Sequence, residues 1–119
     1  MNFDDIPIFS GGTVLSKKSE LERLRDEIAR VTLEIFCLCK RRIELARKIA
    51  TVKMKEGLPI EDLKVERNLK RRVLEFCRGS GIEDEFCIGL LDLLIRESKR
   101  VQEEEIGSGS PEMREEGFS

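Results

Sequence analysis

The chain has 119 residues, a formal net charge of −2 and no histidine, so its length suffices for one domain but not for two independent cores. With this charge and only 5% aromatic residues, it lacks the basic excess and base-stacking platforms of nucleic-acid-binding proteins. Without histidine, neither a histidine base nor a Ser–His or Cys–His nucleophile pair can form within the chain.

Residues 1–18 are expected to form a flexible N-terminal arm, in which Pro7 and Gly11-Gly12 surround a short apolar patch. The arm lacks the basic stretch and long apolar run of a secretory signal. No run in the chain approaches the ~18 apolar residues of a membrane span. We therefore expect a cytoplasmic protein that does not bind membranes.

A long amphipathic helix is predicted after the arm. Ser19 and Glu22 form a capping-box pattern at its start, and Gly57 followed by Pro59 marks its end, which gives about 37 residues and a length of roughly 55 Å. Apolar residues recur at alternating steps of three and four along one face, which we call the seam. The seam consists of Leu21, Leu24, Ile28, Val31, Ile35, Leu38, Leu45, Ile49 and Val52.

Arg42 stands where the seam pattern requires an apolar residue. Its guanidinium stays protonated and is costly to bury without an anionic partner. Either a carboxylate of the protein pairs with it, or an anionic ligand does. Which of the two holds decides the function.

Two shorter helices are predicted next. Asp62 caps a helix that runs to about Arg78, the segment Gly79–Gly81 breaks it, and a third helix runs from about Glu83 to Glu105. No window alternates as a strand would, so the fold class is all-α. We expect a helical domain over residues 19–106 and a flexible tail over residues 107–119, which begins GSGS.

A 55 Å seam is too long for two shorter helices of the same chain to cover. The commonest solution is a twofold homodimer, here with the two long helices antiparallel and the shorter helices folded over them. A simple coiled-coil scaffold would also cover the seam, so the polar residues must distinguish the two.

The cysteines are expected to be buried, reduced thiols that act as small hydrophobic residues, as in a cytoplasmic protein. Cys37 and Cys39 lie about 200° apart around their helix, so they cannot bind one metal ion from one face. The others are Cys77 and Cys87.

Each helix carries polar residues that share a face. On the long helix Arg42 and Lys53 do so, and the small Ala46 between them leaves room for a ligand. Each shorter helix carries two polar residues one turn apart. Arg25 lies about 25 Å from Arg42 along the axis, so both could reach one ligand only if Arg25 came from the partner of an antiparallel dimer. The pairs on the shorter helices are Asp62 with Glu66 and Ser98 with Gln102.

The runs LRDEIARVTLEIFCLCKRRIELARKIATVK, GLPIEDLKVER and LLIRESKRVQ resemble the all-helical chorismate mutases, without gaps over about residues 20–105. The resemblance implies three helices per chain in an intertwined six-helix homodimer. It also implies a site built from all three helices plus an arginine of the other subunit, chorismate as the substrate and no cofactor.

The resemblance also implies roles for individual residues. The partner-subunit arginine falls on Arg25 and the carboxylate-binding arginine on Arg42. Lys53 and Gln102 are the donors to the ether oxygen that breaks away. The substrate hydroxyl is contacted by Asp62 and Glu66, and Ser98 joins Gln102 on the third helix.

One position departs from the family pattern, because Val65 stands where the family often has an arginine that supports a substrate carboxylate. Lys64 or Arg67 are candidates to offset the lost charge.

The implied reaction rearranges chorismate to prephenate, for phenylalanine and tyrosine biosynthesis in the shikimate pathway. It needs no proton transfer or covalent intermediate, so a site of fixed charges and hydrogen-bond donors suffices. Two alternatives remain open: an isochorismate pyruvate lyase on the same scaffold, and a non-catalytic helical dimer that regulates a shikimate-pathway enzyme.

Overall fold

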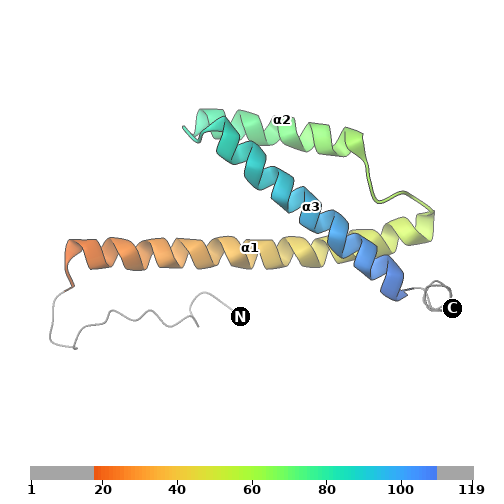
Figure 1. The fold of residues 1–119 in the computed structure, drawn as a ribbon, viewed down its shortest axis with the longest axis horizontal. Helices are drawn as coiled ribbons and strands as arrows, with labels where there is room; N and C mark the ends of the chain where they lie inside the picture. Colours follow the sequence, from red (N-terminus) through yellow and green to blue (C-terminus); the bar gives the residue numbers. More distant parts are fainter. Residues whose placement is uncertain (1–17, 110–119) are drawn as a thin grey trace. The chain divides into compact units, whose positions relative to one another are not determined.

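The computed structural model describes residues 18–109 and consists of three helices (Figure 1). They are α1 (Glu20–Glu56), α2 (Leu63–Gly79) and α3 (Asp84–Gly109). No strand occurs within the described residues, which confirms the all-α prediction. The chain divides within α1 into two parts, residues 1–41 and 42–119.

The ends of α1 are set by the residues that the sequence pattern indicated. Ser19 Oγ accepts a hydrogen bond from the backbone N–H of Glu22 at 3.1 Å, which satisfies one of the free donors of the first turn. At the other end Gly57 has a φ of 69°, a left-handed conformation that glycine adopts without a steric penalty. The backbone N–H of Leu58 then bonds to the carbonyl of Lys53 at 2.8 Å, as in a Schellman motif.

The shorter helices begin and end close to the predicted positions. The Asp62 side chain accepts from the backbone N–H of Val65 at 3.2 Å and so caps α2. Gly81, with a φ of 74°, closes α2 in the same way as Gly57 closes α1. Helix α3 continues to Gly109, beyond the predicted end near Glu105 and into the segment expected to be a tail. The rest of that tail and the N-terminal arm, except residue 18, lie outside the described residues.

A disulfide joins α2 to α3 between Cys77 and Cys87, so the prediction of reduced thiols was wrong for this pair. Cys77 lies in the last turn of α2 and Cys87 in the first turn of α3, and the short connection between the helices brings the two side chains face to face. Both are buried, with 6% and 4% of their surface exposed. Cys37 and Cys39 are free, as expected.

The core of the second part of the chain is small, whereas the seam is not covered. Ala46, Ala50, Leu91 and Val101 are buried together with the two bonded cysteines. All nine apolar seam residues are exposed, over a range from 47% for Ile49 to 68% for Ile28. Each part of the chain thus exposes its own share of the seam. Among the described residues, no helix has both the length and the apolar character needed to span a bilayer.

Candidate active site

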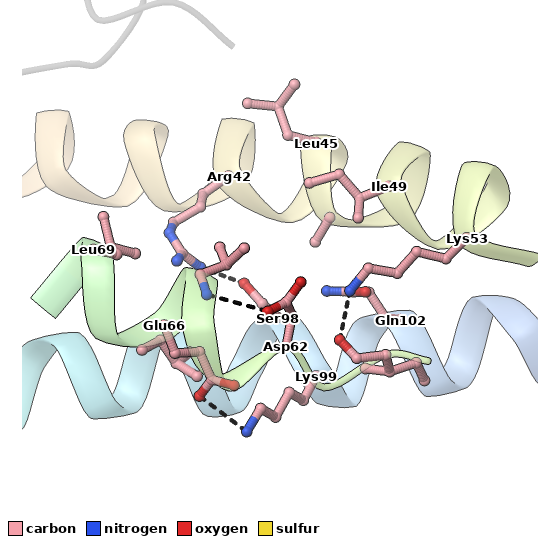
Figure 2. A pocket seen from close by; sticks show the side chains of 14 residues that line it. Arg42, Leu45, Ile49, Lys53, Asp62, Glu66, Leu69, Ser98, Lys99 and Gln102 are labelled. Carbon is pink, nitrogen blue, oxygen red and sulfur yellow. Dashed lines mark hydrogen bonds and ion pairs between the residues drawn. The ribbon is translucent and has the colours of Figure 1, made fainter. Parts of the chain in front are cut away.

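A cavity of about 450 Å³ lies in the second part of the chain and is lined by all three helices (Figure 2). Its volume falls within the range of small-molecule binding pockets. Hydrophobic side chains make up half of the lining: Leu45, Ala46, Ile49, Ile60, Val65, Leu69 and Ile95. The other half is polar or charged: Arg42, Lys53, Asp62, Glu66, Ser98, Lys99 and Gln102.

Arg42 reaches from α1 to α3 and has only neutral partners. Its guanidinium donates to the backbone carbonyl of Leu94 at 2.8 Å. It also donates to Ser98 Oγ, as Figure 2 shows. Among the described residues no carboxylate pairs with it. These contacts fix its orientation without neutralising its charge, which stays available for an anionic ligand.

Lys53 provides a second cation about three turns further along α1. Its ammonium donates to the backbone carbonyl of Ile60 at 2.5 Å, and within the described part of the chain it forms no ion pair. Between the two cations, the buried Ala46 presents only a methyl group to the cavity. Two unneutralised positive charges therefore line an otherwise largely apolar wall.

Gln102 is the polar residue most deeply buried in the cavity wall, with 6% of its surface exposed. Its Oε1 atom is buried and has no hydrogen-bond partner in the described residues. An unsatisfied buried polar atom in a native structure is costly and calls for an explanation. Oε1 can only accept, so a ligand donor would satisfy it, whereas the nitrogen of the same amide can donate to a ligand oxygen.

The opposite wall holds carboxylates. Lys99 Nζ lies 3.1 Å from Glu66 Oε1 and 2.8 Å from Glu61 Oε1. Hydrogen bonds to Glu61 and then to Glu66 raise the pKa of Lys99, so this ammonium stays protonated. The second oxygen of Glu66, Oε2, is buried without a partner among the described residues. Asp62 also lines the cavity, with one oxygen used to cap α2.

Lys99 was not among the residues singled out from the sequence. The available signal was its position three residues before Gln102, which puts both on one face of α3. That signal is weak, because most lysines on a helix face solvent. Val65 lines the cavity, whereas Lys64 and Arg67 are exposed and do not. The third cation of the cavity lining, Lys99, thus comes from α3, not from α2.

Of the seven residues predicted for the site, the cavity brings six together, all but Arg25. Arg25 lies in the first part of the chain, where it is exposed on α1. Its participation would require a second copy of the chain, and this remains a prediction. No group of His, Cys, Asp or Glu residues that could hold a metal ion occurs within the described residues.

Three helices with a partly apolar cavity that presents unpaired cations define a small all-helical protein with a site for an anionic organic molecule. The chain belongs to the chorismate mutase type II family, whose sequence pattern matches residues 24–103, so the resemblance noted from the sequence is confirmed. Members of this family are isomerases.

Two relatives show how far the similarity extends. A 4-amino-4-deoxychorismate mutase of Streptomyces venezuelae is 28% identical over 89 residues, which cover 75% of this chain and 86% of the relative. A chorismate mutase of Methanocaldococcus jannaschii is 26% identical over 85 residues, 71% of this chain and 86% of that relative. No solved structure matches the chain significantly.

Proposed function

We propose that the chain catalyses the rearrangement of chorismate to prephenate, a step of aromatic amino acid biosynthesis. The observation that carries this proposal is the pair of cations, Arg42 and Lys53, that line one cavity without carboxylate partners among the described residues. Chorismate carries two carboxylates, so it supplies the negative charge that this wall lacks.

The site would act by positioning and electrostatics alone. In the rearrangement a C–O bond breaks while a C–C bond forms, and the two carbons must first be brought together from an extended conformer. Arg42 would hold one carboxylate, so that the compact conformer is favoured over the extended one. Negative charge grows on the ether oxygen as its bond breaks. Lys53 and the Gln102 amide would donate to that oxygen more strongly in the transition state than in the ground state.

We further propose that the active form is an intertwined six-helix homodimer. The exposed seam supports this, because apolar patches of such length on a soluble protein mark an interaction surface. In a twofold antiparallel pair, Arg25 of one copy would reach the cavity of the other and bind the second carboxylate. The cavity of a single copy then lacks one cation, and dimerisation completes it.

A cytoplasmic location also remains our proposal. It rests on the free thiols of Cys37 and Cys39, since thiols stay reduced in the cytosol. The Cys77–Cys87 disulfide weighs against it, because disulfides are rare in cytosolic proteins outside hyperthermophiles.

The experiment that tests the function is incubation of the purified protein with chorismate while the loss of its absorbance and the appearance of prephenate are followed. Prephenate formation supports the mutase, and pyruvate release from isochorismate would instead indicate the lyase. Turnover of neither substrate would indicate the non-catalytic dimer. The family match and the two relatives favour neither the lyase nor the non-catalytic dimer.

4-Amino-4-deoxychorismate should be included as a third substrate, since the Streptomyces relative is named for it. It differs from chorismate only in an amine at the ring carbon that carries the chorismate hydroxyl. At neutral pH this amine is an ammonium, so the pair of substrates reports on the charge that the site accepts.

A further inference from the structure

We propose that Lys99 determines which ring substituent the site accepts: by pairing with Glu66, it biases the cavity toward a neutral hydroxyl donor and against an ammonium. This inference rests on the proposed function and adds a specificity-determining residue to it. It arises from the arrangement of Lys99, Glu61 and Glu66 around one buried oxygen atom.

The first step concerns the hydrogen bond that this oxygen lacks. Lys99 holds Glu66 through Oε1 at 3.1 Å, while Oε2 is buried in the cavity wall without a partner among the described residues. An ionised carboxylate can only accept hydrogen bonds. Glu66 lines the cavity, so a ligand group that contacts its carboxylate must be a donor, and both a hydroxyl and an ammonium qualify.

The second step concerns charge. Lys99 is kept protonated by its contacts with both glutamates, which raise its pKa. Its ammonium pairs with the same carboxylate group that the ligand donor must approach, and Lys99 itself lines the cavity. An ammonium at that place meets a carboxylate whose attraction is already partly used by Lys99, whereas a neutral hydroxyl is little affected. Asp62 lines the same cavity, so removal of Lys99 would leave Asp62 and Glu66 to attract a cationic donor.

The experiment compares kcat/KM for chorismate and for 4-amino-4-deoxychorismate in the wild-type chain, Lys99→Gln and Lys99→Arg. The ratio of the two values is the readout, because loss of folded or active protein lowers both equally and leaves the ratio unchanged. Lys64→Gln is the matched control. It removes the same charge from an exposed position that does not line the cavity.

We expect Lys99→Gln to shift the ratio toward the amino substrate by about tenfold, the effect of roughly 1.4 kcal/mol of charge repulsion. Lys99→Arg and Lys64→Gln should keep the wild-type ratio. An unchanged ratio in Lys99→Gln, or an equal shift in Lys64→Gln, would overturn the inference. If Lys99→Gln turned over neither substrate, the dissociation constants of the two substrates would be compared, with the same shift expected.

Failure of the proposed function would look different. In that case the wild-type chain would convert neither chorismate nor the amino substrate, and no ratio would exist. Conversion of chorismate with a ratio that is insensitive to position 99 would leave the mutase activity in place and remove only the role of Lys99.

Discussion

The charged side chains on the two walls of the cavity differ in whether they are paired. On the α1 side, Arg42 and Lys53 donate only to neutral oxygens and keep their charge available. On the opposite side, Glu66 is already paired with Lys99, which in turn is shared with Glu61. Unpaired cations suit strong attraction of an anion, whereas a paired carboxylate suits the selection of one donor over another. We call the side with Arg42 and Lys53 the cationic wall and the side with Asp62, Glu66 and Lys99 the acidic wall. The cationic wall should thus govern whether the substrate reacts, and the acidic wall should govern which substrate is accepted.

The largest effect should come from the donors proposed for the breaking ether bond. Lys53→Ala and Gln102→Ala are each expected to lower kcat by about 10²–10³, the usual cost of removing one preorganised donor at a developing negative charge. Helicity by circular dichroism and dimerisation by light scattering should be unchanged. Lys48→Ala, an exposed position of α1 that does not line the cavity, is the control. Full activity in either variant would show that the replaced residue is not a donor to the ether oxygen.

A second large effect tests whether the cationic wall is completed by another copy of the chain. Arg25→Ala and Arg42→Ala should each be nearly inactive. Mixed under conditions that allow subunit exchange, they should regain activity in about a quarter of the sites. Random pairing in a twofold dimer makes half of the dimers mixed, each with one intact site. Demonstrated exchange without regained activity would contradict the sharing of a site between subunits.

The cationic wall could be predicted from the sequence because helical periodicity is local. Arg42 interrupts an apolar seam, and steps of three and four place Lys53 on its face, so the spacing alone distinguishes both residues. The helix ends could be predicted equally well, since Ser19, Gly57 and Asp62 act on the first or last turns of their own helices. The acidic wall could be predicted from the sequence only in part. Asp62 and Glu66 follow from spacing, but the approach of Lys99 to Glu66 depends on how α3 packs against α2.

The disulfide was missed for a related reason. Cys77 and Cys87 belong to different helices, so their contact depends on the angle at which the α2–α3 connection brings those helices together. A cysteine count alone does not provide that angle, and the expectation of a cytoplasmic protein favoured free thiols. The extension of α3 into the GSGS segment was missed because glycine and serine have low helix propensity, which the preceding helix evidently overrides for one turn.

The disulfide provides a test at the level of stability. Replacement of Cys77 and Cys87 by alanine should lower the free energy of unfolding by about 2–3 kcal/mol, since the bond closes a short loop whose entropy the unfolded chain would regain. Chemical denaturation with and without a reductant measures the difference. Because the bond joins the two helices that carry the acidic wall, the substrate ratio should respond to reduction more than kcat does. Alanine at Cys37 and Cys39, which are free, should remove no reductant-sensitive stability.

The smallest expected effect lies at the same connection, where Arg78 holds the first residue of α3. Its Nε and Nη2 atoms donate to the carboxylate of Asp84, at 2.9 Å for the shortest contact. The hydrogen bond from Arg78 lowers the pKa of Asp84 below its ordinary value of 3.8 in the folded chain. A group with a lowered folded pKa contributes stability above its unfolded pKa, and that contribution is lost as the pH falls through the folded pKa.

Asp84→Asn should therefore destabilise the chain slightly at pH 7. The difference in stability from wild type should shrink below about pH 4, because the Asp84 carboxyl then becomes protonated in both the folded and the unfolded chain. Unfolding midpoints measured from pH 7 to pH 2 check this. Since the pair is exposed, the effect should also weaken at high ionic strength. Arg78→Gln removes the ion pair but keeps the favourable interaction of the Asp84 carboxylate with the N-terminus of α3. In that background Asp84→Asn should therefore lower the stability by less than it does in the wild-type chain. A difference that persists unchanged at pH 2 would show that the charge of Asp84 is not its source, and the connection between the helices would then owe its stability to the disulfide and the Gly81 cap alone.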